Sequence, residues 1–123
     1  MKYISTRGND GPLGYEEALL SGLARDGGLY LPLSYPCFSS EEIDAMHGLS
    51  YPELAGLIMA RFTDGEIEAD ELTVMARDVY AGFNDPAVAP LRYLSGNIHV
   101  LELFHGPTIA FKDYAMQFLA RAF

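Results

Sequence analysis

Residues 101–113 are the most informative part of this 123-residue chain, and they read Leu101-Glu102-Leu103-Phe104-His105-Gly106-Pro107-Thr108-Ile109-Ala110-Phe111-Lys112-Asp113. The first residues of this stretch predict a strand, and Gly106-Pro107 predicts a turn. From Phe111 to Phe123 apolar residues recur at helical spacing, which predicts an amphipathic helix. Lys112 therefore lies next to the start of an apolar helix.

Lys112 is the candidate catalytic residue. The apolar neighbours Ile109 and Phe111 and the helix N-terminus favour the neutral amine, whereas the carboxylate of Asp113 favours the ammonium. A neutral amine is the form that forms Schiff bases with carbonyl groups. From spacing alone, a solvated surface lysine is the commoner interpretation.

The rest of the chain alternates short strands with amphipathic helices. Ser39 or Ser40 suits a helix N-cap, and Ser50 with Glu53 resembles a capping box. The patterns predict strands at Lys2–Thr6, Leu29–Pro32, Leu91–Leu94 and His99–Phe104, and helices at Tyr15–Leu23, Glu41–Met46, from Ser50 onward, and Asp70–Phe83. The fold class predicted is α/β, as an α+β fragment with a mostly helical N-terminal domain.

Asn84-Asp85-Pro86 is the best candidate for a domain boundary, which divides the chain into residues 1–84 and 85–123. The last helix carries an apolar stripe that includes Phe118 and Phe123, without a C-cap after it. Such an end favours a truncated chain over a short protein whose last helix packs on itself. It also predicts self-association through this stripe.

Composition limits the classes of function. The formal charge is −9, with 17 acidic against 8 basic residues, which argues against nucleic-acid binding but leaves room for a small anionic ligand. Cys37 is the sole cysteine, and the N-terminus lacks an apolar signal core. No apolar run approaches the ~20 residues that cross a bilayer. A soluble cytoplasmic protein with no membrane partner is expected.

Metal and phosphate sites are not predicted. The three histidines are too scattered for a metal centre, and residues 26–28 predict a turn instead of a phosphate-binding loop. The acidic stretch 64–71 approaches calcium-loop spacing but lacks the full ligand pattern. A solvated loop followed by a helix start is the better interpretation.

The run from Glu102 to Thr108, followed by Ala110-Phe111-Lys112-Asp113, resembles the cofactor-lysine motif of the threonine synthase family. Residues 3–8 (YISTRG) resemble the start of that family, and residues 22–32 (GLARDGGLYLP) resemble its next block. Ile109 and Tyr114 stand where related sequences vary. Three blocks in the family's order, spread along the whole chain, make chance a poor explanation.

The resemblance implies a fold-type II enzyme that uses pyridoxal 5'-phosphate, a carbon–oxygen lyase acting on phosphate. It implies conversion of O-phospho-L-homoserine and water to L-threonine and phosphate. Lys112 would bind the cofactor through its amine and then carry protons. The candidates beside it are Phe111 and Asp113 at the cofactor, and Thr108 and His105 lining the substrate pocket. Arg7 is a further candidate for the substrate, because its guanidinium could bind a phosphate or carboxylate through two hydrogen bonds. A structural role is the alternative for the last three, and a helix cap is the alternative for Asp113.

The resemblance also implies that much of the machinery lies beyond Phe123, including the loop that holds the cofactor phosphate. Residues 85–123 would supply only the first strand and helix of the cofactor domain, so the fragment alone is expected to be inactive. Two alternatives stay open. One is a non-catalytic binding or assembly module that keeps the motif, and the other is a relative with altered substrate.

Overall fold

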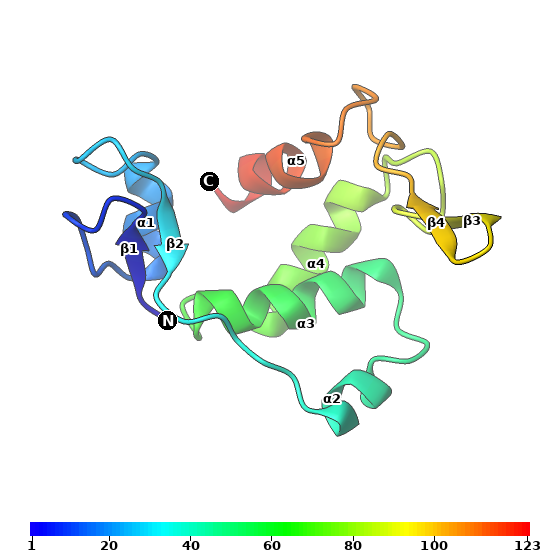
Figure 1. Cartoon of the computed structure of the whole chain (residues 1–123), viewed down its shortest axis with the longest axis horizontal. Coiled ribbons are helices and arrows are strands. Elements are labelled where there is room, and N and C mark those ends of the chain that lie inside the picture. The colour runs from blue at the N-terminus through cyan, green and yellow to red at the C-terminus, as the bar shows by residue number, and fades with distance from the viewer.

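The computed structural model describes residues 1–123 as five helices and two small antiparallel sheets, in agreement with the predicted α+β class. In Figure 1 the helices α3 and α4 lie in the middle, a small N-terminal sheet with α1 lies on one side, and a hairpin lies on the other. The elements in chain order are β1 (Tyr3–Ser5), α1 (Tyr15–Ser21), β2 (Tyr30–Pro32), α2 (Ser40–Ala45), α3 (Tyr51–Thr63), α4 (Ala69–Tyr80), β3 (Leu91–Ser95), β4 (Ile98–Leu101) and α5 (Asp113–Ala122).

The N-terminal sheet pairs β1 with β2, and Tyr3 lies opposite Pro32. Tyr3 and Ser5 are buried while Ile4 between them is half-buried, as expected where successive side chains alternate between faces. Gly28 packs so tightly that an added Cβ would lie 2.1 Å from Ser5 Oγ. The predicted helix Tyr15–Leu23 ends early, at Ser21, because Gly22 takes a positive φ of 66° that ends the helix.

Helices α3 and α4 form the centre of the molecule. The predicted capping box begins α3, where the Glu53 carboxylate accepts the backbone N–H of Ser50 at 2.8 Å. The helices approach so closely that a Cβ on Gly56 would lie 2.1 Å from Thr73 Oγ1. Helix α4 buries Leu72 fully and ends at Tyr80, so Phe83 of the predicted stripe packs from the following turn.

The apolar core joins α4 to α5. Its members, all buried, are Leu72, Ala76, Tyr80, Phe83, Val88 and Phe118. Phe118, one residue of the C-terminal apolar stripe, is thus buried in this core, whereas Phe123 of the same stripe remains 70% exposed. The core draws residues from both sides of Asn84-Asp85-Pro86, and the domain boundary there stays a prediction.

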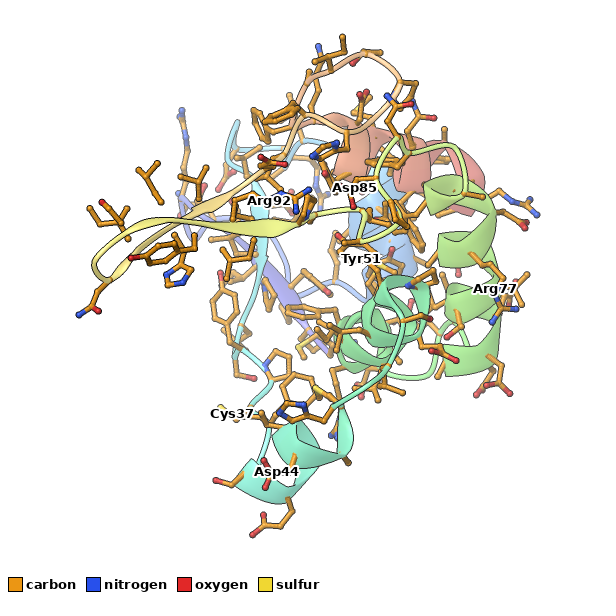
Figure 2. The ribbon with its side chains drawn as sticks, turned by 90° about the vertical axis from the view of Figure 1, so that its right-hand side faces the viewer. Cys37, Asp44, Tyr51, Arg77, Asp85 and Arg92 are labelled. Carbon is orange, nitrogen blue, oxygen red and sulfur yellow. The ribbon has the colours of Figure 1, made fainter.

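The hairpin β3–β4 projects from the body of the molecule (Figure 2), and every residue from 91 to 100 is exposed. The predicted strand His99–Phe104 is wrong at its C-terminal end, because β4 stops at Leu101. The N–H of Glu102 donates to the carbonyl of Pro90 at 3.0 Å, and Pro90 has no N–H to return. The chain then leaves the hairpin, and the His105 carbonyl accepts the N–H of Asn84 at 2.8 Å.

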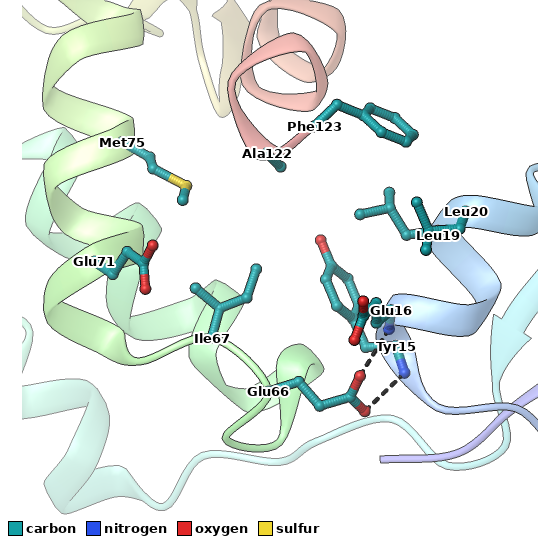
Figure 3. Close-up of a pocket in the computed structure, with 10 residues that line it drawn as sticks. All are labelled: Tyr15, Glu16, Leu19, Leu20, Glu66, Ile67, Glu71, Met75, Ala122 and Phe123. Carbon is teal, nitrogen blue, oxygen red and sulfur yellow. Dashed lines mark hydrogen bonds between the residues drawn. The ribbon is translucent and has the colours of Figure 1, made fainter.

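Three contacts attach the N-terminal sheet and α1 to the turn between α3 and α4. The Tyr3 hydroxyl donates to the Phe62 carbonyl at 2.9 Å, and the N-terminal ammonium pairs with Asp64. The Glu66 carboxylate accepts the first N–H groups of α1, from Tyr15 at 2.9 Å and from Glu16 at 2.7 Å (Figure 3). A carboxylate at a helix N-terminus meets both free donors and the positive end of the dipole.

Candidate functional site

Lys112 is the residue immediately before α5, and its backbone is already helical, with φ −64° and ψ −18°. Its carbonyl accepts the N–H of Met116 at 2.8 Å, the first hydrogen bond of the helix. The side chain is exposed, as is that of Phe111, which is 74% exposed. The two neighbouring side chains are therefore both open to solvent at the N-terminal end of a helix.

Asp113 and Thr108 are hydrogen-bonded to each other across the loop that leads to Lys112. The Asp113 carboxylate accepts the backbone N–H of Thr108 and its hydroxyl, each at 2.7 Å. Asp113 is only 2% exposed. The Thr108 hydroxyl, above all, holds the pKa of this carboxyl below its usual range, against the opposing effect of burial. Asp113 is thus a buried carboxylate whose two oxygens are both engaged within the loop.

Gly106 leaves the space that the Asp113 side chain occupies. A Cβ at this position would lie 2.5 Å from Asp113 Cβ and 2.6 Å from its carboxylate oxygen. Any side chain here would push the carboxylate away from Thr108. The Gly106-Pro107 turn that the sequence predicted therefore has a second role, because it admits Asp113.

His105 faces away from the loop and belongs to an ionic cluster at the base of the hairpin. The cluster consists of Asp85, Arg92, Glu102 and His105. The His105 ring lies 2.8 Å from the Glu102 carboxylate, and the Arg92 guanidinium lies 3.0 Å from Asp85 and 3.5 Å from Glu102. Figure 2 shows Arg92 and Asp85 side by side where the hairpin leaves the body.

Arg7 lies in the turn after β1, in the N-terminal sheet. Its N–H donates to Ser5 Oγ at 3.1 Å, and its guanidinium lies over Gly27 without an ion pair. The sheet and the loop into α5 lie apart in Figure 1. The structure thus brings Thr108, Phe111, Lys112 and Asp113 into one loop, with His105 at its entrance, but leaves Arg7 elsewhere.

Sequence reasoning missed a second polar centre, around Asp10. Its carboxylate accepts the Tyr30 hydroxyl at 2.6 Å, the Arg25 N–H at 2.7 Å and the Arg25 guanidinium at 2.9 Å. The Tyr30 hydroxyl and then Arg25 hold the pKa of Asp10 well below its usual range. The partners lie 15 and 20 residues from Asp10, so no local spacing marks them.

A cavity of about 400 Å³ lies between α1, α4 and the end of α5 (Figure 3). Apolar side chains such as Leu19, Met75 and Phe123 line it together with the three glutamates Glu16, Glu66 and Glu71. Lys112 does not line it, so the amine and the cavity are separate features of the molecule. The cavity instead marks where the N-terminal unit meets the central helices.

Two further findings concern metals and membranes. No group of three or more His, Cys, Asp or Glu side chains is arranged to hold a metal ion. None of the five helices combines the length and the apolar character that a membrane crossing requires.

Comparison with solved structures defines the class of fold. The structure described as PLP-bound threonine synthase from Brucella melitensis superposes with a TM-score of 0.92 at 56% identity, covering 99% of this chain and 26% of that one. Threonine synthase from yeast gives a TM-score of 0.86 at 37% identity, over 98% of this chain and 25% of that one. The fold is therefore that of the N-terminal part of an α+β enzyme.

Sequence comparisons give the family. Residues 2–80 match the family described as threonine synthase N terminus. The threonine synthase of Pseudomonas aeruginosa is 52% identical over 121 residues, which cover 98% of this chain and 26% of that protein. The chain belongs to the threonine synthase family, as its resemblance to three sequence blocks predicted. It spans about a quarter of the length of the relatives that it matches.

Proposed function

We propose that this chain supplies the N-terminal region and the cofactor lysine of a threonine synthase, a lyase that converts O-phospho-L-homoserine and water to L-threonine and phosphate. One observation carries the proposal: Lys112 is exposed at the start of α5, at the end of a loop whose sequence matches the family's cofactor-lysine motif. The solved relative from Brucella melitensis, described as PLP-bound, shares nearly the whole of this backbone.

The residues present fit the aldehyde end of pyridoxal phosphate. The exposed Lys112 offers a nucleophile, and the preceding residue in the sequence, Phe111, offers a 74%-exposed aromatic surface for a flat ring. When bound, pyridoxal phosphate supplies an electron sink for the negative charge that develops on substrate carbons. Lys112 Nζ would hold the cofactor and, once released by substrate, accept and return the protons that the reaction moves.

The roles of the other residues follow from their contacts. Phe111 would provide apolar surface to the cofactor ring. Asp113, which is buried, would act within the loop more than as a cofactor ligand. Thr108 is engaged with Asp113, and His105 with Glu102, so a substrate contact by either would require one of these bonds to open. Arg7, which has no ion pair, keeps a free guanidinium for an anion.

The chain's own composition provides a test of the cofactor assignment. Lys112 and Lys2 are its two lysines, so Lys2 serves as an internal reference amine. Pyridoxal phosphate followed by borohydride should label Lys112 in preference to Lys2, as measured by peptide mass spectrometry. The variant Lys112→Ala should lose the absorbance band of the cofactor adduct, whereas Lys2→Ala should keep it. Equal labelling of both lysines would remove Lys112 from the role.

The second candidate function is a non-catalytic binding or assembly module. The fully exposed hairpin β3–β4 favours it, because its apolar side chains include Tyr93, Leu94 and Ile98, each more than half exposed. Such a module would keep the loop without preferential labelling of Lys112. The same labelling experiment therefore separates the two functions.

The proposal includes a cytoplasmic location. It is supported by a single, exposed and unpaired cysteine, Cys37, which suits a reducing compartment. Fractionation of cells with an antibody against the chain would test it, and recovery in an extracytoplasmic fraction would contradict it.

A further inference from the structure

We propose that Asp113 and Thr108 are positioning residues for Lys112, and that they lock the preceding loop so that the amine is held in place before any cofactor arrives. The inference rests on the proposed function of Lys112 as the cofactor lysine. It assigns Asp113 and Thr108 a role through the loop instead of a direct contact with cofactor or substrate.

The first argument is the engagement of Asp113. Its two carboxylate oxygens are occupied by Thr108, one by the backbone N–H and the other by the hydroxyl, both at 2.7 Å. With 2% exposure the group has little surface left for a ligand. A buried carboxylate is stable only when it is hydrogen-bonded, so breaking these bonds to reach a ligand would be costly.

The second argument is the geometry of the loop between them. The N–H of Ile109 donates to the Gly106 carbonyl at 3.1 Å, and the N–H of Asp113 donates to the Ala110 carbonyl at 3.0 Å. Ile109 adopts a φ of +62°, which is unfavourable for a β-branched residue. A loop persists in such a conformation when the surrounding bonds over-determine it. The carboxylate bridge between Asp113 and Thr108 is the bond that spans the loop.

The third argument is the anchorage of α5 on the other side of Lys112. The Tyr114 hydroxyl donates to the Val88 carbonyl at 2.6 Å, and the Tyr80 hydroxyl donates to the Tyr114 carbonyl at 3.0 Å. Burial raises the pKa of Tyr80 to about 12, as expected for a hydroxyl in the apolar core. The backbone of Lys112 thus lies between two fixed points, whereas the side chains of Ile109, Phe111 and Lys112 all face outward.

This arrangement has a consequence for reactivity. A backbone that is ordered beforehand does not lose conformational entropy when the amine takes up a ligand, which is how rigid loops improve a functional site. A loosened loop would present the same amine with the freedom of an ordinary surface lysine. Lys2, next to β1, is an exposed amine outside this loop and serves as the reference in the same molecule.

The test uses the 123-residue chain and pyridoxal phosphate itself. The chain is mixed with pyridoxal phosphate, trapped with borohydride and digested, and the ratio of adduct on Lys112 to adduct on Lys2 is measured. Thr108→Val keeps the shape but removes the hydroxyl, and Thr108→Ser keeps the hydroxyl as a matched control. We expect Thr108→Val to lower the ratio about fivefold, the effect of one hydrogen bond, and Thr108→Ser to preserve it.

Circular dichroism of each variant establishes that the fold is retained, and Asp113→Ala, which removes both acceptor oxygens, replaces Thr108→Val if that variant unfolds. An unchanged ratio in a folded Thr108→Val or Asp113→Ala variant would overturn the positioning role alone. Equal labelling of Lys112 and Lys2 in the parent chain would instead overturn the proposed function, and the positioning role with it. A lowered ratio that Thr108→Ser restores supports both.

Discussion

The two small sheets of this molecule are built in opposite ways. The N-terminal sheet has strands of only three residues, yet it buries Tyr3 and Ser5 and surrounds two carboxylates with hydrogen-bond donors. The hairpin β3–β4 has longer strands, with an irregularity in the pairing between Tyr93 and Ser95, yet every residue from 91 to 100 is exposed. Strand length and structural stability are therefore separate properties, because a two-stranded hairpin without a covered face is marginal in water.

The carboxylates of the N-terminal sheet predict the largest difference, which is a local sensitivity to acid. The pKa of Asp10 lies well below its usual range because of the Tyr30 hydroxyl and Arg25, and the pKa of Asp26 is lowered chiefly by the Ser5 hydroxyl. A carboxyl group whose pKa is lower in the folded state stabilises the fold fully when the pH is above its unfolded-state pKa of about 4. This stabilisation is lost as the pH falls toward the folded-state pKa. The sheet should loosen in this acid range, while the hairpin changes little.

Amide exchange or NMR shifts of residues 3–32 and 91–101, followed from pH 6 downward to about pH 2, would measure this difference. Asp10→Asn serves as the control, because it removes the titrating group and should flatten the acid response of Tyr30. An identical acid response in the variant would exclude Asp10 as its source.

Close packing predicts the next effect. Gly28→Ala would place a Cβ 2.1 Å from Ser5 Oγ in the buried N-terminal sheet. Overpacking of this kind costs about 2 kcal/mol of unfolding free energy. Gly96→Ala in the hairpin meets open space and carries only the penalty of its positive φ of 56°, about 1 kcal/mol. Urea unfolding monitored by circular dichroism should show a clearly lower midpoint for Gly28→Ala, and equal midpoints would contradict the packing argument.

The smallest effect is expected on the exposed face of the hairpin. Leu94 is 64% exposed, so Leu94→Lys should change the unfolding free energy by less than about 0.5 kcal/mol. The same change should weaken self-association, if the hairpin contributes to it alongside Phe123 at the end of α5. Sedimentation velocity at rising concentration would compare Leu94→Lys and Phe123→Asp with the parent chain. A parent chain that remains monomeric would contradict self-association altogether.

Local signals in the sequence predicted most of the helices, because caps and periodicity act over a few residues. Ser50 and Glu53 lie three positions apart, and their hydrogen bond is the one expected. The cap of α1 was not foreseen, because its carboxylate comes from Glu66, 51 residues away from Tyr15. The predicted strand His99–Phe104 extends past the observed end at Leu101, because that end depends on the partner residue Pro90.

The candidate site shows the same division. The motif identified Lys112 and its apolar neighbour Phe111 without any knowledge of the fold. It did not indicate that Asp113 is buried, because this depends on the missing side chain of Gly106 seven residues earlier. Nor did it indicate that His105 turns toward Glu102, since this orientation is set by the ionic cluster at the hairpin. The roles of Lys112 and Phe111 stay predictions from the motif, and the directions of the Asp113 and His105 side chains came only from the structure.

The N-terminal sheet and α1, here called the N-terminal unit, are attached to the rest of the molecule through residues 62–66. Tyr3, Met1, Tyr15 and Glu16 all bind within these five consecutive residues, at one end of the unit. Because all of these contacts go to one short segment, residues 62–66 set the position of the whole N-terminal unit. That unit supplies Leu19 to the cavity and α5 supplies Phe123, so the shape of the cavity depends on the same short segment.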